Sequence, residues 1–176
     1  MLKVFAAQKT EYPNSAALVQ RILSKEYGET NFCLLKTANG KPYLTGIANE
    51  NARNVSISHT NEWYFVAFSS EEIGIDAEPL DRTVDFSKIT RKFTENERSQ
   101  IRSTEDFLRF WTMRESVVKH LGITIIESFK RLSFDCGTTI LDGAPFPVSL
   151  LRSTWQGHSV CVCKSTAEEV SIVRIV

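Results

Sequence analysis

Three strand-like runs lie between residues 54 and 79 with almost no chain between them, and this feature constrains the fold most. Apolar and polar residues alternate in the first run, NVSISH at 54–59. The second run, WYFVAFS at 63–69, is rich in aromatic and β-branched residues, and the third, IGIDAE at 73–78, ends at a proline. The connections between these runs are too short for the crossover that a parallel strand pair needs. The sequence therefore predicts antiparallel pairing in this region.

Two helical zones interrupt the strand-like runs. After a first strand at 2–7, a helix is predicted to begin at Asn14 or Ser15 and to end at Gly28. Turn residues break the stretch between residues 40 and 46. The motif Thr94-x-x-Glu97 is a capping box, and apolar spacing then predicts one long helix from about 107 to a stop at Gly122.

From residue 131 onward the chain is predicted to be mostly strands. These are RLSFD, TTIL, FPVSLL, HSVCVC and VSIVRIV, separated by glycine and proline. The order of strand, helix, strands, helix and strands indicates an α+β fold in one domain, residues 1–176. Each half, approximately 1–85 and 86–176, offers a helix followed by strands, although no sequence repeat is visible.

Charge and cysteine content restrict the function classes. The 21 basic and 21 acidic residues balance, which argues against a strongly basic nucleic-acid binder. None of the four cysteines forms a CxxC pair, and free core thiols, such as Cys161 and Cys163 on one strand face, suggest a reducing compartment. No signal peptide and no apolar run long enough for a membrane span are present, so a cytoplasmic location is expected.

Asp76 and Glu78 are the first candidates for chemistry. Their spacing places both carboxylates on one face of a strand, where their repulsion is relieved by a cation such as Mg²⁺. Taken alone, a D-x-E pair is more often a solvent-exposed strand face.

Trp111, Glu115 and Lys119 form one stripe of the predicted long helix. Taken alone, this is an ordinary surface ion pair beneath a packed tryptophan. Together with Asp76 and Glu78, however, Glu115 completes a set of three carboxylates with an ammonium nearby. Such a set suits a metal-bound phosphate anhydride. His59, at the end of a strand, can bind phosphate or serve only as a structural hydrogen-bonding residue.

Three segments in this order resemble the Sfp-like 4′-phosphopantetheinyl transferase superfamily. Residues 40–43 with 55–59 resemble the family's GKP and N-x-S-H segments, residues 74–78 match G-[IV]-D-x-E, and residues 110–119 match its tryptophan, lysine–glutamate and lysine motif. Residues 93–97 also resemble the F-[ST]-x-x-E that opens the helical zone. The resemblance covers residues 40–123 well and the remainder more loosely.

The resemblance implies a fold of two pseudo-twofold halves, each with a helix and a mostly antiparallel sheet. It also implies transfer of the 4′-phosphopantetheine arm of coenzyme A to a serine of an apo acyl or peptidyl carrier protein, with release of 3′,5′-ADP. By motif position, Asp76, Glu78 and Glu115 would hold Mg²⁺. Glu115 would also act as the base and Lys119 would steady the leaving phosphate. The nucleotide end of coenzyme A would be contacted by Lys41, Ser58 and His59.

The chain departs from the family pattern at three places. Ser56 stands where the family has asparagine, and Arg114 stands where it has lysine, which keeps the charge but changes the hydrogen-bonding geometry. The N-terminal region is short and has few candidates for gripping the 3′-phosphate of coenzyme A. These are Lys3, Lys9, Arg21 and Lys25, with Arg53 as a substitute.

Three functions remain to be distinguished. The first is a monomeric transferase with its site between the two halves, whose Asp76 and Glu115 are expected to be exposed in the cleft. The second is a degenerate protein that binds a carrier domain or coenzyme A without catalysis, and the third is a metal-dependent phosphohydrolase. None of these readings involves nucleic acid or a membrane, and none names the carrier protein.

Overall fold

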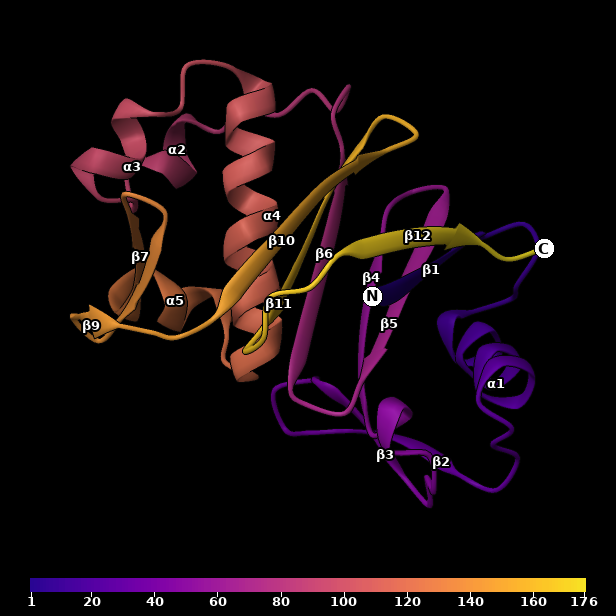
Figure 1. Cartoon of the computed structure of the whole chain (residues 1–176). Helices are drawn as coiled ribbons and strands as arrows, with labels where there is room; N and C mark the ends of the chain where they lie inside the picture. The colour runs from indigo at the N-terminus through magenta and orange to yellow at the C-terminus, as the bar shows by residue number, and fades with distance from the viewer.

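A computed structural model describes the whole chain, residues 1–176 (Figure 1). The helices are α1 (Ser15–Glu26), the 3₁₀ helix η1 (Glu50–Ala52), α2 (Ser87–Thr90), α3 (Glu95–Ser99), α4 (Thr104–Leu121) and α5 (Ile125–Arg131). The strands are β1 (Leu2–Gln8), β2 (Cys33–Lys36), β3 (Pro42–Thr45), β4 (Asn54–His59), β5 (Trp63–Ser69), β6 (Ile73–Pro79), β7 (Leu132–Asp135), β8 (Thr138–Leu141), β9 (Ala144–Pro145), β10 (Ser149–Trp155), β11 (His158–Lys164) and β12 (Val170–Arg174). The α+β prediction is confirmed.

The first main sheet has the strand order β12-β1-β5-β4, and α1 covers one of its faces (Figure 1). The side chain of Asn14 caps α1 by accepting a hydrogen bond from the backbone N–H of Ala17 at 2.9 Å. Leu18, Val19, Ile22 and Leu23 are buried, as their helical spacing predicts. Antiparallel pairing holds for β1–β5 and β4–β5, whereas β1 and β12 run parallel.

The second main sheet has the order β10-β11-β6, and the long helix α4 lies along it (Figure 1). The Ser103 side chain caps the start of α4, and Gly122, with φ of 68°, ends it in the left-handed region that favours glycine. The helix approaches β6 so closely at Gly74 that a Cβ there would stand 1.9 Å from the carbonyl oxygen of Ser116. This contact fixes α4 against the strand that carries Asp76.

The two main sheets pack face to face. A buried cluster joins β1 and β5 of the first sheet to β6 and β11 of the second, with α1 and α4 on the outer faces. Its members are Leu2, Val4, Ala6, Trp63, Phe65, Ala67, Ile73, Ile75, Ala77, Val160 and Val162. The molecule is therefore layered as helix, sheet, sheet and helix.

A smaller lobe surrounds the outer side of α4 and is held by a buried ion pair. Arg114 and Glu97, each at most 1% exposed, pair at 2.6 Å. Arg114 also donates to the backbone carbonyls of Ser128 and Leu132, and Glu97 closes the predicted capping box with Thr94. The Arg114 guanidinium thus connects α3, α5 and β7 to α4. This gives Arg114 a structural role, away from any phosphate.

Several local predictions need correction. The stretch 40–46, expected as turns, contains β3, which forms a hairpin with β2, and α2 and α5 were not expected as helices. The strand expected at FPVSLL lies later, at Ser149–Trp155. Cys161 and Cys163 are buried free thiols as expected, but Cys33 and Cys136 are exposed.

The two halves exchange strands. β6 lies before residue 85 yet pairs with β11, and β12 lies after it yet pairs with β1. The division of the chain into two halves at residue 85 stays a prediction, because each main sheet contains a strand from the other half of the sequence. No helix has both the length and the apolar composition needed to cross a bilayer.

Candidate active site

The face of β6 that α4 covers carries the two predicted carboxylates. Asp76 is paired in register with Cys161 of β11, whose sulfur lies 3.4 Å from the hydroxyl of Ser116 on α4. Glu78 follows two residues later and shares that face. The alternation of β6 therefore directs Ile73, Ile75 and Ala77 into the core and the carboxylates toward the helix.

Helix α4 brings Lys119 and Glu115 to the same place. The Nζ of Lys119 donates to Oδ1 of Asp76 at 2.7 Å. Glu115, one helical turn before Lys119, is half-buried beside both β6 carboxylates. The four residues predicted from two separate motifs thus meet at the contact between β6 and α4.

The negative charge of Asp76 contributes to a raised proton affinity at both Glu78 and Glu115. Burial, with the negative charges of Asp76 and Glu78, raises the pKa of Glu115 to about 7. Burial also raises the pKa of Glu78, against the effect of its 2.7 Å ion pair with Arg82. The site therefore favours an added positive charge.

Ser58 and Asp76 form a buried hydrogen-bonded pair across two strands. The Ser58 hydroxyl donates to Oδ1 of Asp76 at 2.9 Å and accepts the backbone N–H of Ala77 at 3.2 Å. Asp76 is 6% exposed, so the expectation that it is an exposed cleft residue is wrong. Its other oxygen, Oδ2, is buried and has no hydrogen-bond partner.

The donor set fits a divalent, oxygen-binding cation. Three carboxylates share the site, and the unpartnered Oδ2 of Asp76 is an acceptor that lacks a ligand. As the side chains stand, no three acidic, histidine or cysteine side chains are grouped closely enough to enclose a metal ion. Lys119 and Arg82 supply the positive charge to Asp76 and Glu78 instead.

His59 lies exposed at the end of β4, and two lysines share its surroundings. Its pKa is lowered by partial burial and by the charges of Lys9 and Lys119, while Asp76 acts in the opposite direction. Its ring meets Tyr64 edge-on with centroids 6.5 Å apart, and Lys9 Nζ lies 5.3 Å from the Tyr64 ring centre. Sequence reasoning could not place Lys9, because only the pairing of β1 with β5 brings it beside Tyr64.

Lys41 lies away from this group, at the C-terminal end of α4. Its Nζ donates to the carbonyl oxygen of His120 at 2.6 Å and pairs with Glu72. Asn39 from the same loop donates to the carbonyl of Gly122 at 3.0 Å. The loop therefore caps the last turn of α4, where the helix dipole favours a cation.

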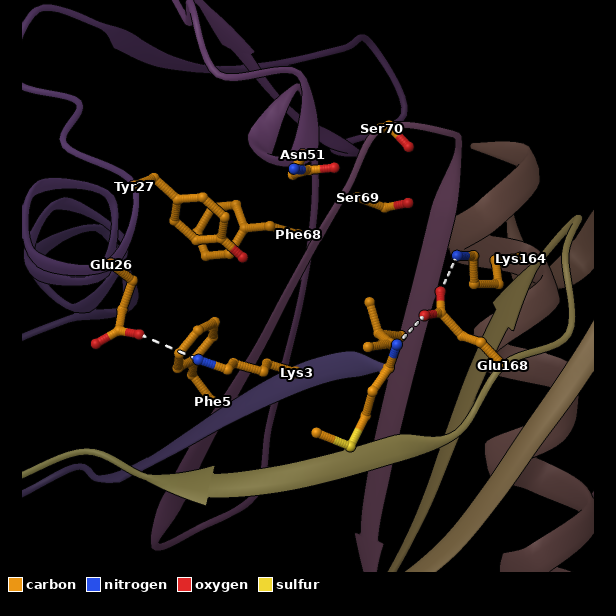
Figure 2. A pocket seen from close by; sticks show the side chains of 12 residues that line it. Lys3, Phe5, Glu26, Tyr27, Asn51, Phe68, Ser69, Ser70, Lys164 and Glu168 are labelled. Atoms are coloured by element: carbon orange, nitrogen blue, oxygen red, sulfur yellow. Dashed lines mark hydrogen bonds and ion pairs between the residues drawn. The ribbon is translucent and has the colours of Figure 1, made fainter.

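A separate hollow of about 400 Å³ lies at the opposite end of the first sheet (Figure 2). It lies where Ser69 pairs with Asn54, whereas the candidate site lies where Tyr64 pairs with His59, roughly 17 Å along the strands. Lys3 and Lys164 beside it pair with Glu26 and Glu168, as the dashed lines in Figure 2 show. The charged side chains around this hollow therefore form ion pairs with one another.

Comparison with known proteins gives a consistent family. The model of the 4′-phosphopantetheinyl transferase superfamily matches residues 72–163, which include β6 and α4. The chain is 26% identical over 125 residues to the L-aminoadipate-semialdehyde dehydrogenase-phosphopantetheinyl transferase of Xenopus laevis, covering 62% of this chain and 41% of the relative. It is 32% identical over 125 residues to the protein of the same name from Homo sapiens, covering 62% and 40%.

A bacterial relative gives the same result. The 4′-phosphopantetheinyl transferase Sfp of Bacillus subtilis (strain 168) is 27% identical over 113 residues, covering 60% of this chain and 49% of the relative. The matches thus span less than half the length of each of these relatives.

Proposed function

Because the chain belongs to the 4′-phosphopantetheinyl transferase superfamily, with an Sfp-like sequence, we propose that it transfers the 4′-phosphopantetheine group of coenzyme A to a serine of an apo carrier protein. The transfer depends on Mg²⁺ and releases 3′,5′-ADP. One observation carries the proposal: Asp76, Glu78, Glu115 and Lys119 meet between β6 and α4. Both elements lie within the segment that the family model matches.

Asp76, Glu78 and Glu115 are the residues proposed to hold Mg²⁺. Bound there, the ion would offset the charge of the pyrophosphate oxygens of coenzyme A. Binding requires Asp76 to share or release its contact with Lys119, and Glu78 its contact with Arg82. The released Lys119 ammonium would then be free to bind the departing phosphate.

Glu115 is proposed to accept the proton of the incoming serine hydroxyl, directly or through water. It is half-buried on α4, beside the carboxylates that orient the phosphates. Lys119 stabilises the negative charge that grows on the leaving 3′,5′-ADP. The proton moves from the serine to Glu115 as the new serine–phosphorus bond forms and the bond to the leaving phosphate breaks.

Lys9 and His59 are proposed to bind a phosphate of the nucleotide end of coenzyme A. The charges of Lys9 and Lys119 both act on His59, so the three form a basic patch beside the carboxylates. Ser58 was predicted as a coenzyme A ligand, but its hydroxyl is already used by Asp76 and the Ala77 N–H, and we assign it to holding Asp76. Lys41 as a coenzyme A ligand stays a prediction.

The proposed reaction fits a monomeric cytoplasmic enzyme whose partners are coenzyme A and an apo acyl or peptidyl carrier protein. The rival function is a carrier-binding or coenzyme A-binding protein without catalysis. The full set of three carboxylates and one lysine favours the enzyme, because a binder has no need of it.

The test is incubation with Mg²⁺, coenzyme A and a panel of apo carrier proteins, followed by mass spectrometry. We expect a mass gain of one phosphopantetheine arm on at least one carrier. Glu115→Gln should abolish the gain, while Glu62→Gln, an exposed glutamate outside the site, should retain it. No gain on any carrier, with metal-independent binding of coenzyme A by calorimetry, would establish the rival. Release of 3′,5′-ADP without an acceptor would instead indicate a phosphohydrolase.

A further inference from the structure

A second cavity, of about 340 Å³, lies between α4 and the edge of the second main sheet, and its lining is entirely polar. The six lining residues are Arg109, Thr112, Arg152, Ser153, Thr154 and Ser159. None of them belongs to the proposed active site. Arg109 is about 120° around α4 from Glu115, whereas Thr112 is about 60° from it and Ser159 is directly opposite Glu78 of β6. The cavity therefore adjoins the active site, and its two arginines lie on the side away from the carboxylates.

Strand register and helix spacing bring these side chains together. Arg152 and Thr154 are two residues apart on β10 and so share a face, and Thr154 is directly opposite Ser159 of β11. On α4, Arg109 and Thr112 are three residues apart and face the same way. Arg109 Nη1 lies 3.4 Å from the hydroxyl of Thr154, which closes the ring of groups from helix to strand.

The charge of the cavity is positive. Its lining contains two guanidinium groups and no carboxylate. The exposed Arg152 side chain makes no ion pair or hydrogen bond, although it is close enough to act electrostatically on the buried Cys161 thiol. Arg109 is held on one side by Glu105 at 2.7 Å, and its Nη1 points to the cavity side at Thr154.

Two buried hydroxyls form the floor. Thr112 and Ser159 are 1% and 4% exposed, and their hydroxyl oxygens lie 3.0 Å apart. The Thr112 hydroxyl donates to the carbonyl oxygen of Arg109 at 3.0 Å, so Ser159 is the donor to Thr112. Because a serine hydroxyl can rotate, Ser159 can turn its proton from Thr112 toward an anion in the cavity. One available hydroxyl proton beside two arginines is suited to an oxygen atom that carries negative charge.

We propose that this cavity is a binding site for a phosphate group, held by Arg109 and Arg152 and by the Ser159 hydroxyl. A phosphate has the negative charge to pair with two guanidiniums and an oxygen to accept the Ser159 hydroxyl proton. The group can belong to free inorganic phosphate or to a phosphate monoester, and the chemistry of recognition is shared. The proposal does not rest on the pantetheine transfer proposed above.

The test follows the arginine side-chain Nε–H signals by NMR in the metal-free protein during titration with inorganic phosphate, against potassium chloride at equal ionic strength. We expect Arg109 and Arg152 to shift together and to saturate, with a dissociation constant on the order of 1 mM from two charge-assisted contacts. Shifts that do not saturate, or that chloride reproduces, would overturn the proposal.

Two variants are expected to change the phosphate affinity in opposite directions. Arg152→Gln should weaken the response of Arg109 at least about fivefold, and Arg91→Gln, an exposed arginine outside the cavity, should leave it unchanged. Glu105→Gln should tighten binding roughly twofold, because it frees Arg109 from its exposed partner. An unchanged affinity in Arg152→Gln would contradict the proposal.

Two further arms identify the source of the phosphate and separate this site from the active site. Tighter binding of O-phosphoserine than of inorganic phosphate would indicate a monoester, and the reverse a free ion, whereas equal binding of acetate would overturn phosphate recognition. His59→Ala should leave the Arg109 response intact. Neither coenzyme A nor a carrier protein is present, so failure of the transfer reaction would not alter this outcome.

Discussion

Ser56 and Ser58 join the two main sheets through side chains instead of a backbone ladder. Ser56 accepts the backbone N–H of Ile75 at 2.9 Å, and Ser58 accepts that of Ala77 at 3.2 Å. Both serines are buried. They differ in one respect, since only Ser58 also donates to the carboxylate of Asp76.

This difference provides a matched pair of variants. Ser58→Ala removes a charge-assisted hydrogen bond from Asp76, so we expect kcat to fall about tenfold and the Mg²⁺ requirement to rise, with little change in the KM for coenzyme A. Ser56→Ala should destabilise the protein by about 1 kcal/mol but retain most activity. Steady-state kinetics and calorimetric Mg²⁺ titration measure both effects. A raised KM for coenzyme A in Ser58→Ala would restore Ser58 as a direct ligand.

His120 makes the free energy of unfolding depend on pH. It is 7% exposed, and its Nδ1 has no hydrogen-bond partner. Burial and the Lys41 charge lower its pKa, while Glu72 and the backbone carbonyl of Cys163 oppose the shift. The Phe146 ring packs edge-on against the His120 ring, with the ring centroids 6.0 Å apart. The neutral ring is therefore the form that the folded protein favours.

The lowered pKa determines the direction in which stability changes with pH. The stabilisation is fully present above the ordinary histidine pKa of about 6.5 and is lost as the pH falls through the folded-state value. We expect His120→Gln to lose less unfolding free energy than the wild type between pH 7.5 and pH 5, by on the order of 1 kcal/mol. Urea unfolding at the two pH values measures this, and identical losses would exclude His120 as the cause.

The limits of sequence reasoning at this scale are visible in Asp76. Alternation correctly placed it with Glu78 on one face of a strand, but a local pattern does not show what covers that face. Helix α4 covers it, and Ser58 reaches it from another sheet, so a residue expected to be exposed is buried. Lys9 was predicted only as one of several basic candidates for the same reason, since its neighbours come from distant strands.

At the scale of elements, Gly74 controls the distance between β6 and α4. A Cβ at this position would stand 1.9 Å from the Ser116 carbonyl oxygen and 2.4 Å from the His120 nitrogen, and both are backbone atoms that cannot turn aside. Glycine at this position is thus required by close approach and not by backbone conformation.

Gly74→Ala should therefore move the helix. We expect a loss of roughly 3 kcal/mol or more of unfolding free energy, with loss of activity, because Lys119 moves away from Asp76. Gly28→Ala is the control: its φ of 72° makes alanine strained, but its Cβ would meet nothing within 4 Å, so a cost of about 1 kcal/mol is expected with activity retained. Equal effects in thermal unfolding would contradict the close-packing argument.

Elements with strong local signals were predicted well. The strands at 54–59 and 63–69, the Thr94 capping box and the Gly122 stop all appear where the sequence places them. The β2–β3 hairpin was missed because Gly40 and Pro42 indicate a turn without showing that strands flank it. Helix α5 was missed although Thr124-x-x-Glu127 is a capping box like that of α3, because seven residues are too few to show a clear helical period.

At the scale of the whole molecule, one chain supplies every residue of the proposed site. Asp76 and Glu78 come from β6, Glu115 and Lys119 from α4, and His59 from β4. Since no second copy is needed, we expect a monomer by light scattering and a transferase rate that is strictly proportional to protein concentration. A rate that rises more steeply on concentration would show that a second subunit completes the site.

The exchange of β6 and β12 between the two sheets has a consequence for folding during synthesis. Each half of the chain contains a strand whose hydrogen-bonding partner lies in the other half. While the ribosome has released only the first half, β6 lacks β11 and the outer edge of β1 lacks β12, so neither sheet can be completed. The long-range pairings then form late and together, which favours slow, all-or-none folding once both halves have been synthesised.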